Sequence, residues 1–297
     1  MLNADKMNAK IIDGLSVANK IQAQVKEQVD VLAAQGVKPC LCTILVGEDT
    51  ASISYINKKQ RAAAELGIVT KDLRFPTTLK QEELEKIISE LNADSRVHGV
   101  LVQLPLPDHI DQNKAISVLD PFKDVDGLTP FNAGMLLKGS PIITPCTPAG
   151  ILELLDFYKI DVVGMDATII NRSSLVGKPL ACLFAERGAS VTICHSKSRR
   201  LQEKLVRSEI IVSAVGNREK FTLTEDMVNS NTVVIDVGIS RVNGRICGDV
   251  DFDAVKNKAS WITPVPGGVG PMTVAILLRN TVTSTRLSIK SRSDLAG

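Results

Sequence analysis

The chain has 297 residues, 44% of them apolar and 23% charged, which suits a globular protein with one large or two ordinary cores. Its 35 basic and 33 acidic side chains leave a net charge of +2, which argues against a nucleic-acid-binding protein. No apolar run reaches the length of a membrane span, and the first residues lack the apolar stretch of a signal peptide. The six cysteines form no Cys-x-x-Cys pair, so we expect a cytoplasmic protein without a disulfide framework.

Helical and strand patterns alternate through the first half of the chain. Helical spacing predicts helices, and short apolar runs closed by glycine or proline predict buried strands. The expected helices cover residues 15–35, 52–66, 81–91, 113–118 and 149–158, and the expected strands cover residues 40–46, 73–75 and 97–104. Thr147 and Pro148 suit the start of the last helix as its cap and first-turn proline.

The same alternation continues through the second half. The expected strands are residues 167–170, 191–194, 210–215, 233–237 and 261–263, and the expected helices are residues 179–187, 201–206 and one from Met272. Such alternation favours parallel sheets with helices on both faces. We therefore expect an α/β protein with two α/β lobes and a ligand cleft between them, the second lobe being Rossmann-like. The first lobe is expected to hold residues 1–148 plus 272–297, and the second residues 149–271.

Residues 262–273 form an unusual run, Ile-Thr-Pro-Val-Pro-Gly-Gly-Val-Gly-Pro-Met-Thr. Its prolines fix φ and its glycines permit conformations that other residues avoid, so neither a helix nor a regular strand suits it. We expect one fixed loop with bare amides before a helix, which suits an anion or a flat polar ring. A tight strand-to-helix loop without a ligand is the alternative for the glycines alone.

Tyr55 and Lys59 are four residues apart and therefore share one face of a predicted helix. A lysine whose pKa is lowered by burial can move a proton at working pH, while the tyrosine polarises a substrate. The same pair is also typical of a solvated helix face. Gln103 is a polar residue in an apolar strand, at the end where open α/β sheets bind ligands, although it can equally pair with backbone.

The segment 120–127 places several carboxylates on a loop, which indicates either a binding site or a turn with a helix cap. A metal site there would also need histidine or cysteine ligands at a suitable spacing. No histidine or cysteine has the spacing of metal ligands, so we expect no metal.

Residues 171–177 follow a predicted strand and precede a helix, the position of a dinucleotide phosphate loop. The G-x-G-x-x-G fingerprint is absent, but Asn171 tolerates the left-handed backbone that a glycine would supply. The next strand ends in His-Ser-Lys-Ser-Arg-Arg at 195–200, where NAD-specific domains carry an acid. These cations and Arg172 favour the 2′-phosphate of NADP. A solvated basic loop is the alternative, and His195 can equally be a surface histidine.

Seven motifs occur together in a fixed order. They are Tyr55-x-x-x-Lys59, Gln103-Leu-Pro-Leu-Pro, Lys123-Asp-Val-Asp126-Gly, Pro145-Cys-Thr-Pro148, Arg172-Ser-x-x-Val-Gly177, Val234-Ile-Asp-Val-Gly238 and Pro264-Val-Pro-Gly-Gly-Val-Gly-Pro271. The set resembles the bifunctional methylenetetrahydrofolate dehydrogenase/methenyltetrahydrofolate cyclohydrolase family. This resemblance extends from residue 12 to residue 283, which is nearly the whole chain.

The resemblance implies two linked reactions. NADP oxidises 5,10-methylenetetrahydrofolate to 5,10-methenyltetrahydrofolate, which water then converts to 10-formyltetrahydrofolate. Lys59 is implied to be the central catalytic group, held and tuned by Gln103. Tyr55 would orient the folate, and Asp126 would hydrogen-bond the pterin ring, so all four are expected catalytic residues. Family members are usually homodimers, and we expect a homodimer here.

The resemblance also assigns binding residues. Those implied to bind the tetrahydrofolate substrate are Tyr55, Ser52, Gln103, Leu104, Asp126, Pro264, Gly267, Gly268 and Pro271. Those implied to bind the NADP cofactor are Asn171, Arg172, Ser173, Val176, Gly177, His195, Ser196, Val215, Gly216, Gly238 and Ile239. Asn171 stands where the family commonly has glycine, which bears on the affinity for the cofactor.

Three other functions fit parts of the pattern. These are a dehydrogenase without cyclohydrolase activity, an NAD-linked enzyme, and a non-catalytic NADP- or folate-binding protein. Lys59 and Gln103 argue against loss of the hydrolytic step, and the basic loop after Cys194 argues against NAD.

Overall fold

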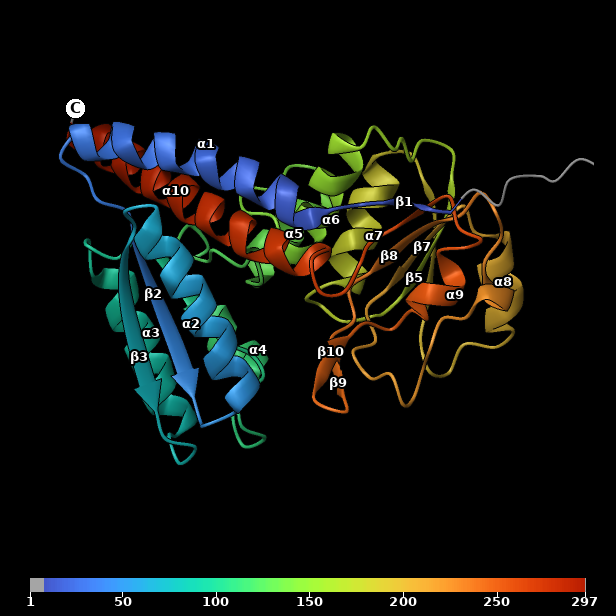
Figure 1. The fold of residues 1–297 in the computed structure, drawn as a ribbon. Coiled ribbons are helices and arrows are strands. Elements are labelled where there is room, and N and C mark those ends of the chain that lie inside the picture. Colours follow the sequence, from blue (N-terminus) through green and yellow to red (C-terminus); the bar gives the residue numbers. More distant parts are fainter. Residues whose placement is uncertain (1–7, 297) are drawn as a thin grey trace, which may run out of the picture. The chain divides into compact units, whose positions relative to one another are not determined.

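The computed structural model describes the backbone of residues 8–296 and the side chains of residues 8–50 and 52–290. The described chain forms two compact units (Figure 1). Unit 1 contains residues 8–18 and 147–273, and unit 2 contains residues 19–146 and 274–296. Helices α1 (Gly14–Ala34) and α10 (Val269–Ala296) begin in unit 1 and continue into unit 2. Taken over the described residues, no helix combines the length and apolar character that a bilayer crossing requires.

Unit 2 is built on a three-stranded parallel sheet in the order β3-β2-β4. Its central strand β2 (Cys40–Val46) is buried along its whole length, between β3 (Val69–Phe75) and β4 (Gly99–Val102). A buried run that is apolar except for Thr43 is what a parallel strand covered on both faces requires. Side chains of α3 (Gln81–Ala93) and α4 (Gln112–Val118) pack in the same core as β2 and β4.

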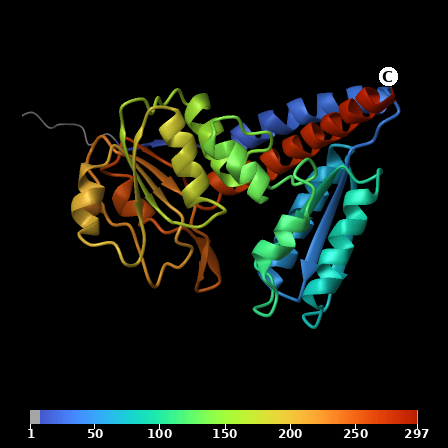
Figure 2. The ribbon, with the colours of Figure 1, turned by 180° about the vertical axis from the view of Figure 1, so that it is seen from behind.

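The remaining helices of unit 2 frame this sheet. Helix α2 (Thr50–Glu65) starts with Asp49 as N-cap, and α5 (Pro130–Leu137) starts with Thr129 as N-cap and a proline in its first turn. The unit 2 parts of α1 and α10 lie side by side in both views (Figures 1 and 2). The N-cap of α2 fixes the backbone near the predicted site residue Ser52, and the loop before α5 carries the predicted site residue Asp126.

Unit 1 contains a six-stranded parallel sheet in the order β1-β11-β8-β7-β5-β6. Its strands are β1 (Lys10–Ile11), β5 (Asp166–Ile170), β6 (Ser190–Cys194), β7 (Ile210–Ser213), β8 (Val233–Asp236) and β11 (Trp261–Ile262). The chain leaves β5 toward β6 on one side and then places β7 on the other side. Open α/β sheets bind ligands at such a switch point, outside the carboxyl ends of the strands.

The helices of unit 1 complete its layers. They are α6 (Cys146–Phe157), α7 (Gly177–Glu186), α8 (Leu201–Arg207) and α9 (Phe252–Val255), with the single turn η1 (Glu225–Met227). One core contains Ile170, Ile211, Val234 and Ile262, which come from four strands of the sheet, together with Leu205 of α8. The predicted α/β class with a Rossmann-like parallel sheet is therefore confirmed.

The first residues group differently from the sequence-based division. Residues 8–18 were expected in the first lobe with residues 1–148, but they belong to unit 1. Strand β1 pairs with β11, the Ile12 N–H donates to Ile262 O at 2.8 Å, and the Leu15 N–H donates to Gly267 O at 3.0 Å. A two-residue strand is too short to leave a periodic signal, so only the fold shows this partnership. The part of that expectation on residues 1–7 lies outside the described residues.

Candidate functional site

Lys59 is buried, with 4% of its surface exposed, on the third turn of α2. Its Nζ lies 4.3 Å from the centroid of the Tyr55 ring and 3.4 Å from Gln103 Oε1. The four-residue spacing on α2 therefore places the tyrosine ring beside the ammonium, as predicted. A cation over an aromatic ring is favourable by about 0.5–2 kcal/mol, more where water is excluded.

Burial lowers the pKa of the Lys59 ammonium from its ordinary value, because the charged form loses its hydration. The charge of Asp126 opposes this shift. Lys59 therefore sits in the electrostatic field of a carboxylate, but with less solvent than a surface lysine has. This is the condition under which a lysine exchanges a proton near working pH.

Gln103 follows directly after β4 and links that strand to the site. Its backbone N–H donates to Ile44 O at 2.9 Å, so it is attached to the central strand β2. Its Nε2 donates to Leu104 O at 2.6 Å, which leaves Oε1 turned to Lys59. Both ends of the amide are thus used, and the orientation of Oε1 is set by its neighbour.

Asp126 and Cys146 both act electrostatically on Lys59. The thiol of Cys146 donates to Val125 O at 3.4 Å, and burial raises its pKa well above the ordinary value. Cys146 is therefore a neutral packing group here. Asn280 of α10 donates from Nδ2 to Val125 O at 2.9 Å and to Thr144 O at 3.0 Å. These bonds tie the two loops that carry Asp126 and Cys146 to one helix.

The Asp126 loop is also held at its start by Lys123. The buried Lys123 Nζ donates to the carbonyls of Leu91, Asn92 and Asp94 at 2.7–2.9 Å, and so caps the end of α3. A lysine at a helix C-terminus is electrostatically favourable. The sequence analysis found Lys123 only as part of a motif, and a lysine cap cannot be read from spacing.

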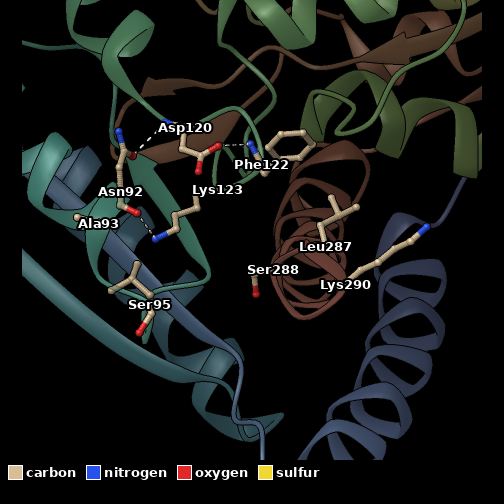
Figure 3. A pocket seen from close by; sticks show the side chains of 10 residues that line it. Asn92, Ala93, Ser95, Asp120, Phe122, Lys123, Leu287, Ser288 and Lys290 are labelled. Atoms are coloured by element: carbon tan, nitrogen blue, oxygen red, sulfur yellow. Dashed lines mark hydrogen bonds between the residues drawn. The ribbon is translucent and has the colours of Figure 1, made fainter. Parts of the chain in front are cut away.

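A hollow of about 390 Å³ lies beside this loop (Figure 3). It is lined by Asn92, Ala93, Ser95, Val97, Asp120, Phe122, Lys123, Leu287, Ser288 and Lys290. Within it, Asn92 Oδ1 accepts from the Asp120 N–H at 3.0 Å, and Asp120 Oδ1 accepts from the Phe122 N–H at 2.9 Å. These contacts brace the loop that leads to Asp126. The lining contains no residue that the sequence analysis assigned to substrate or cofactor.

The other predicted substrate residues have structural contacts of their own. The Ser52 N–H donates to the Asp49 carboxylate at 2.7 Å at the start of α2, and Leu104 accepts the bond from Gln103. Pro264, Gly267, Gly268 and Pro271 lie in unit 1, in or just before α10.

The proline-glycine run is only partly the loop that was expected. Gly267 adopts a φ of +107°, and a Cβ on Gly268 would lie 2.6 Å from Pro264 O, so both positions require glycine. However, α10 begins at Val269 rather than at Met272. Pro271 falls in the first turn of that helix, where a missing N–H costs nothing.

In unit 1, Asn171 follows β5 at the switch point of the sheet. Its Nδ2 donates to Ala214 O, just after β7, at 2.6 Å. Its Oδ1 accepts from the N–H groups of Ser173 at 2.7 Å and Gly177 at 3.1 Å. The left-handed backbone considered for Asn171 is wrong, because its φ is not positive. Its side chain instead closes the loop between β5 and α7.

The remaining phosphate-loop residues surround this closure. A Cβ on Gly177 would lie 2.1 Å from Asn171 O, so only glycine fits at the first residue of α7. Ser173 Oγ accepts from the Val176 N–H at 3.1 Å. Arg172 is exposed beside them. A tight turn leading into a helix N-terminus suits a phosphate group.

The end of β6 presents exposed cations. Ser196, Lys197, Arg199 and Arg200 are exposed, while His195 is half-buried and its Nδ1 accepts from the Lys197 N–H at 3.2 Å. His195 thus shapes the turn. Cations and a serine hydroxyl in place of an acid fit a phosphate on the ribose. The residues present therefore fit NADP.

Val215, Gly216, Gly238 and Ile239 follow the neighbouring strands β7 and β8. Val215, Gly216 and Ile239 are exposed. The carboxylates of Asp236 and Asp249 hold the backbone of these loops, and the sequence analysis assigned neither residue a role. In the sequence Asp249 is a single acidic residue after a short hairpin, and no spacing pattern marks it as a functional residue.

Two family models match the chain over most of its length. The model described as tetrahydrofolate dehydrogenase/cyclohydrolase, catalytic domain, matches residues 12–126. The model described as tetrahydrofolate dehydrogenase/cyclohydrolase, NAD(P)-binding domain, matches residues 145–289. The first range contains Lys59 and its neighbours, and the second contains the parallel sheet of unit 1 from β5 onward.

Individual relatives agree. The chain is 52% identical over 276 residues to a bifunctional protein FolD of Cenarchaeum symbiosum, covering 93% of this chain and 98% of that protein. A solved structure of a bifunctional FolD enzyme, methylenetetrahydrofolate dehydrogenase/cyclohydrolase, from Campylobacter jejuni has a TM-score of 0.90 at 43% identity. It covers 94% of this chain and 99% of that one.

A solved structure of N5,N10-methylenetetrahydrofolate dehydrogenase-cyclohydrolase from Trypanosoma brucei, complexed with NADP cofactor and inhibitor, has a TM-score of 0.90 at 37% identity. That likeness covers 95% of this chain and 99% of the other. Family models, relatives and solved structures all match over nearly the full length of the chain. The chain therefore belongs to the tetrahydrofolate dehydrogenase/cyclohydrolase family.

Proposed function

We propose that this protein is a bifunctional folate enzyme. It oxidises 5,10-methylenetetrahydrofolate with NADP to 5,10-methenyltetrahydrofolate and hydrolyses that product to 10-formyltetrahydrofolate. Family membership supports both reactions, since the two matched models carry both activities in their description. The observation that carries the proposal is the buried Lys59 ammonium with a lowered pKa, between Tyr55 and Gln103.

Lys59 supports the hydrolytic step by exchanging a proton. Attack of water on the methenyl carbon forms a C–O bond and releases one proton. Opening of the ring then breaks the bond from that carbon to N5, forms the formyl C=O with loss of the hydroxyl proton to solvent, and adds a proton to N5, so that one net proton is released. A lysine whose pKa is lowered by burial can accept the first proton and return the second. Gln103 fixes the direction of the amine, and Tyr55 orients the folate ring beside it.

Asp126 hydrogen-bonds the pterin ring in this proposal, with its loop braced by Lys123 and Asn280. Ser52, Leu104 and the segment Pro264–Pro271 contribute the rest of the folate contacts. The cleft expected between the lobes stays a prediction. Oriented binding of the two reactants supplies roughly 7–11 kcal/mol of the barrier reduction in well-placed cases.

NADP, when bound, supplies the hydride acceptor. Arg172 and Ser196 would hold its 2′-phosphate, and Ser173, Val176 and Gly177 would hold its other phosphates. The phosphate loop is already shaped by Asn171, so little backbone ordering is needed on binding.

One assay separates this proposal from its alternatives. Methylenetetrahydrofolate is mixed with NADP or with NAD, and the reduced nucleotide and the methenyl product are followed by absorbance. A bifunctional NADP enzyme reduces NADP faster than NAD and also consumes added methenyltetrahydrofolate. Loss of the second reaction indicates a dehydrogenase alone, faster NAD reduction indicates an NAD-linked enzyme, and absence of turnover indicates a binding protein.

We also propose a cytoplasmic homodimer. The described cysteines are all unpaired thiols, which suits a reducing compartment. A hairpin of β9 (Ser240–Val242) and β10 (Arg245–Cys247) leaves Val242 and Ile246 exposed. Such a patch suits a self-complementary contact. Sedimentation equilibrium is expected to give twice the 32.0 kDa of one chain, and a mass of 32.0 kDa would refute the dimer.

A further inference from the structure

Two buried carboxylates lie beneath the loops that follow β7 and β8. Asp249, which is fully buried, accepts a hydrogen bond from Ser213 Oγ at 2.8 Å and from the Val215 N–H at 2.7 Å, both at Oδ2. Its Oδ1 accepts from the Gly216 N–H at 3.0 Å. One carboxylate therefore takes both backbone donors at the end of β7, and nothing comparable is needed for an ordinary strand-to-loop turn.

Asp236 holds the segment that carries Asp249. Its Oδ1 accepts from the N–H groups of Gly238 at 3.1 Å and Asp249 at 2.9 Å, and its Oδ2 accepts from the Val250 N–H at 3.0 Å. From a third side, Arg218 Nη1 donates to Gly248 O at 2.9 Å and Val250 O at 2.7 Å. Asp249 is thus fixed at its backbone before its side chain reaches the loop after β7.

The backbone packs tightly against both carboxylates. A Cβ on Gly238 would lie 2.2 Å from the Asp249 carboxylate, and a Cβ on Gly248 would lie 1.9 Å from that of Asp236. Burial raises the pKa of Asp236 to about 6, with the charge of Asp249 adding to the rise. Burying two carboxylates this close together costs free energy of folding. We therefore expect the arrangement to serve a function.

We infer that Asp249 is a positioning residue for NADP, which fixes the loops at 215–216 and 238–239 in their binding shape. This inference rests on the proposed function, which assigns those loops to the cofactor. Because the N–H groups of Val215 and Gly216 are already bonded to Asp249, this loop meets the cofactor with its carbonyl oxygens and the Val215 side chain. It therefore selects for hydrogen-bond donors on the ligand, and not for a second anion.

Substitutions of Asp249 test this inference in a graded way. An asparagine keeps one acceptor oxygen, so it can serve either Val215 or Gly216 but leaves the other N–H facing an NH2 group. An alanine serves neither. We expect Asp249→Asn to raise the Kd for NADP about tenfold and Asp249→Ala to raise it further, as lost charged hydrogen bonds do. The Kd is measured by titration of the fluorescence of Trp261 at pH 8, above the pKa of Asp236.

Methenyltetrahydrofolate hydrolysis serves as the second readout, because that reaction uses no NADP. Both variants are expected to hydrolyse it at the wild-type rate within about twofold, a split that general unfolding would not produce. Asp253→Asn is the matched control, since it makes the same chemical change at a side chain that is 87% exposed, and it should leave the Kd unchanged.

An unchanged Kd for NADP in folded Asp249→Ala would overturn the inference. Equal loss of NADP binding and of hydrolysis in Asp249→Asn would also overturn it, because the acid would then support the whole fold. Failure of the proposed function itself is seen separately, in the wild-type protein, which would then neither bind NADP nor turn over the folate.

Discussion

The two units hold their candidate residues in different ways. In unit 2 the groups proposed to act on the folate are side chains, and Lys59 is the only one whose pKa is lowered by burial among the groups described there. In unit 1 the proposed cofactor loops are stretches of backbone, shaped by Asn171 and Asp249. Substitution of Lys59 therefore removes a chemical group and leaves the backbone in place, whereas substitution of Asn171 or Asp249 moves a loop.

The difference also concerns what each unit must do. Proton exchange depends on one ionisable atom whose surroundings are tuned. Binding a long dinucleotide depends on many weak contacts along a fixed backbone. Three predictions follow this comparison, beginning with the change that removes the tuned atom.

Replacing Lys59 with methionine removes the amine but retains much of the volume of the side chain. We expect hydrolysis of methenyltetrahydrofolate to fall about 10²–10⁴-fold, the range that a lost general acid or base produces. The Kd for NADP should stay within about twofold of wild type, because the substitution lies in the other unit. Stopped-flow absorbance gives the first quantity and fluorescence titration the second.

Lys58→Met is the matched control for that experiment, because Lys58 is the exposed neighbour on the same helix. It should retain wild-type hydrolysis. If Lys59→Met and Lys58→Met hydrolyse equally well, then Lys59 has no role in the reaction. If NADP binding falls together with hydrolysis in Lys59→Met, the separation of the two units in the comparison is wrong.

The second prediction concerns the loop that Asn171 closes in unit 1. Asn171→Gly removes three hydrogen bonds and adds backbone freedom, which together destabilise unit 1 by about 2 kcal/mol. Trp261 is the single tryptophan of the chain and lies in β11 of unit 1, so its fluorescence during urea unfolding reports this unit. Ser174→Gly, at an exposed position of the same loop, should cost less than half as much. An unchanged midpoint for Asn171→Gly would show that the loop is shaped without its side chain.

Lys59 and Asn171 also illustrate what could and could not be predicted from the sequence. The pairing of Tyr55 with Lys59 follows from helical spacing, and the place of Gln103 follows from the end of an apolar strand. The predicted buried strand over residues 40–46 coincides with β2, since its residues are apolar except for Thr43. Local patterns of this kind depend on neighbours in sequence, so they survive into the structure.

The rest depends on contacts between distant segments. Asp249 meets Ser213 across 36 residues, Asn171 meets Ala214 across 43, and β1 pairs with β11 near the other end of unit 1. No periodicity encodes such a pairing. Short elements such as α5, β9 and β10 were missed as well, because 3–8 residues contain too few repeats of a pattern. The assignments of individual residues to folate and NADP remain predictions.

The third prediction concerns the change of stability with pH. Lys59 in unit 2 and Asp236 in unit 1 are expected to change the free energy of unfolding in opposite directions as pH rises. The pKa of Lys59 is lower in the folded chain than in the unfolded one, so the unfolded state binds more protons between these two pKa values. The free energy of unfolding therefore rises with pH through this window, up to the ordinary lysine pKa near 10.5. Below the folded pKa the full cost of burying the charged ammonium is present.

Lys59→Met lacks this cost. Its melting temperature is expected to exceed that of wild type at pH 7, and the difference should shrink as pH approaches 10. The trend is measured by calorimetry of both proteins at matched ionic strength, with Lys58→Met as the reference for a surface lysine. Asp236 in unit 1 has the opposite sign, because its pKa is raised to about 6 and stability is lost as pH rises through that value. A gap between Lys59→Met and wild type that stays constant from pH 7 to 10 would show that the Lys59 ammonium carries no burial cost, and that its proton is no easier to remove than that of a surface lysine.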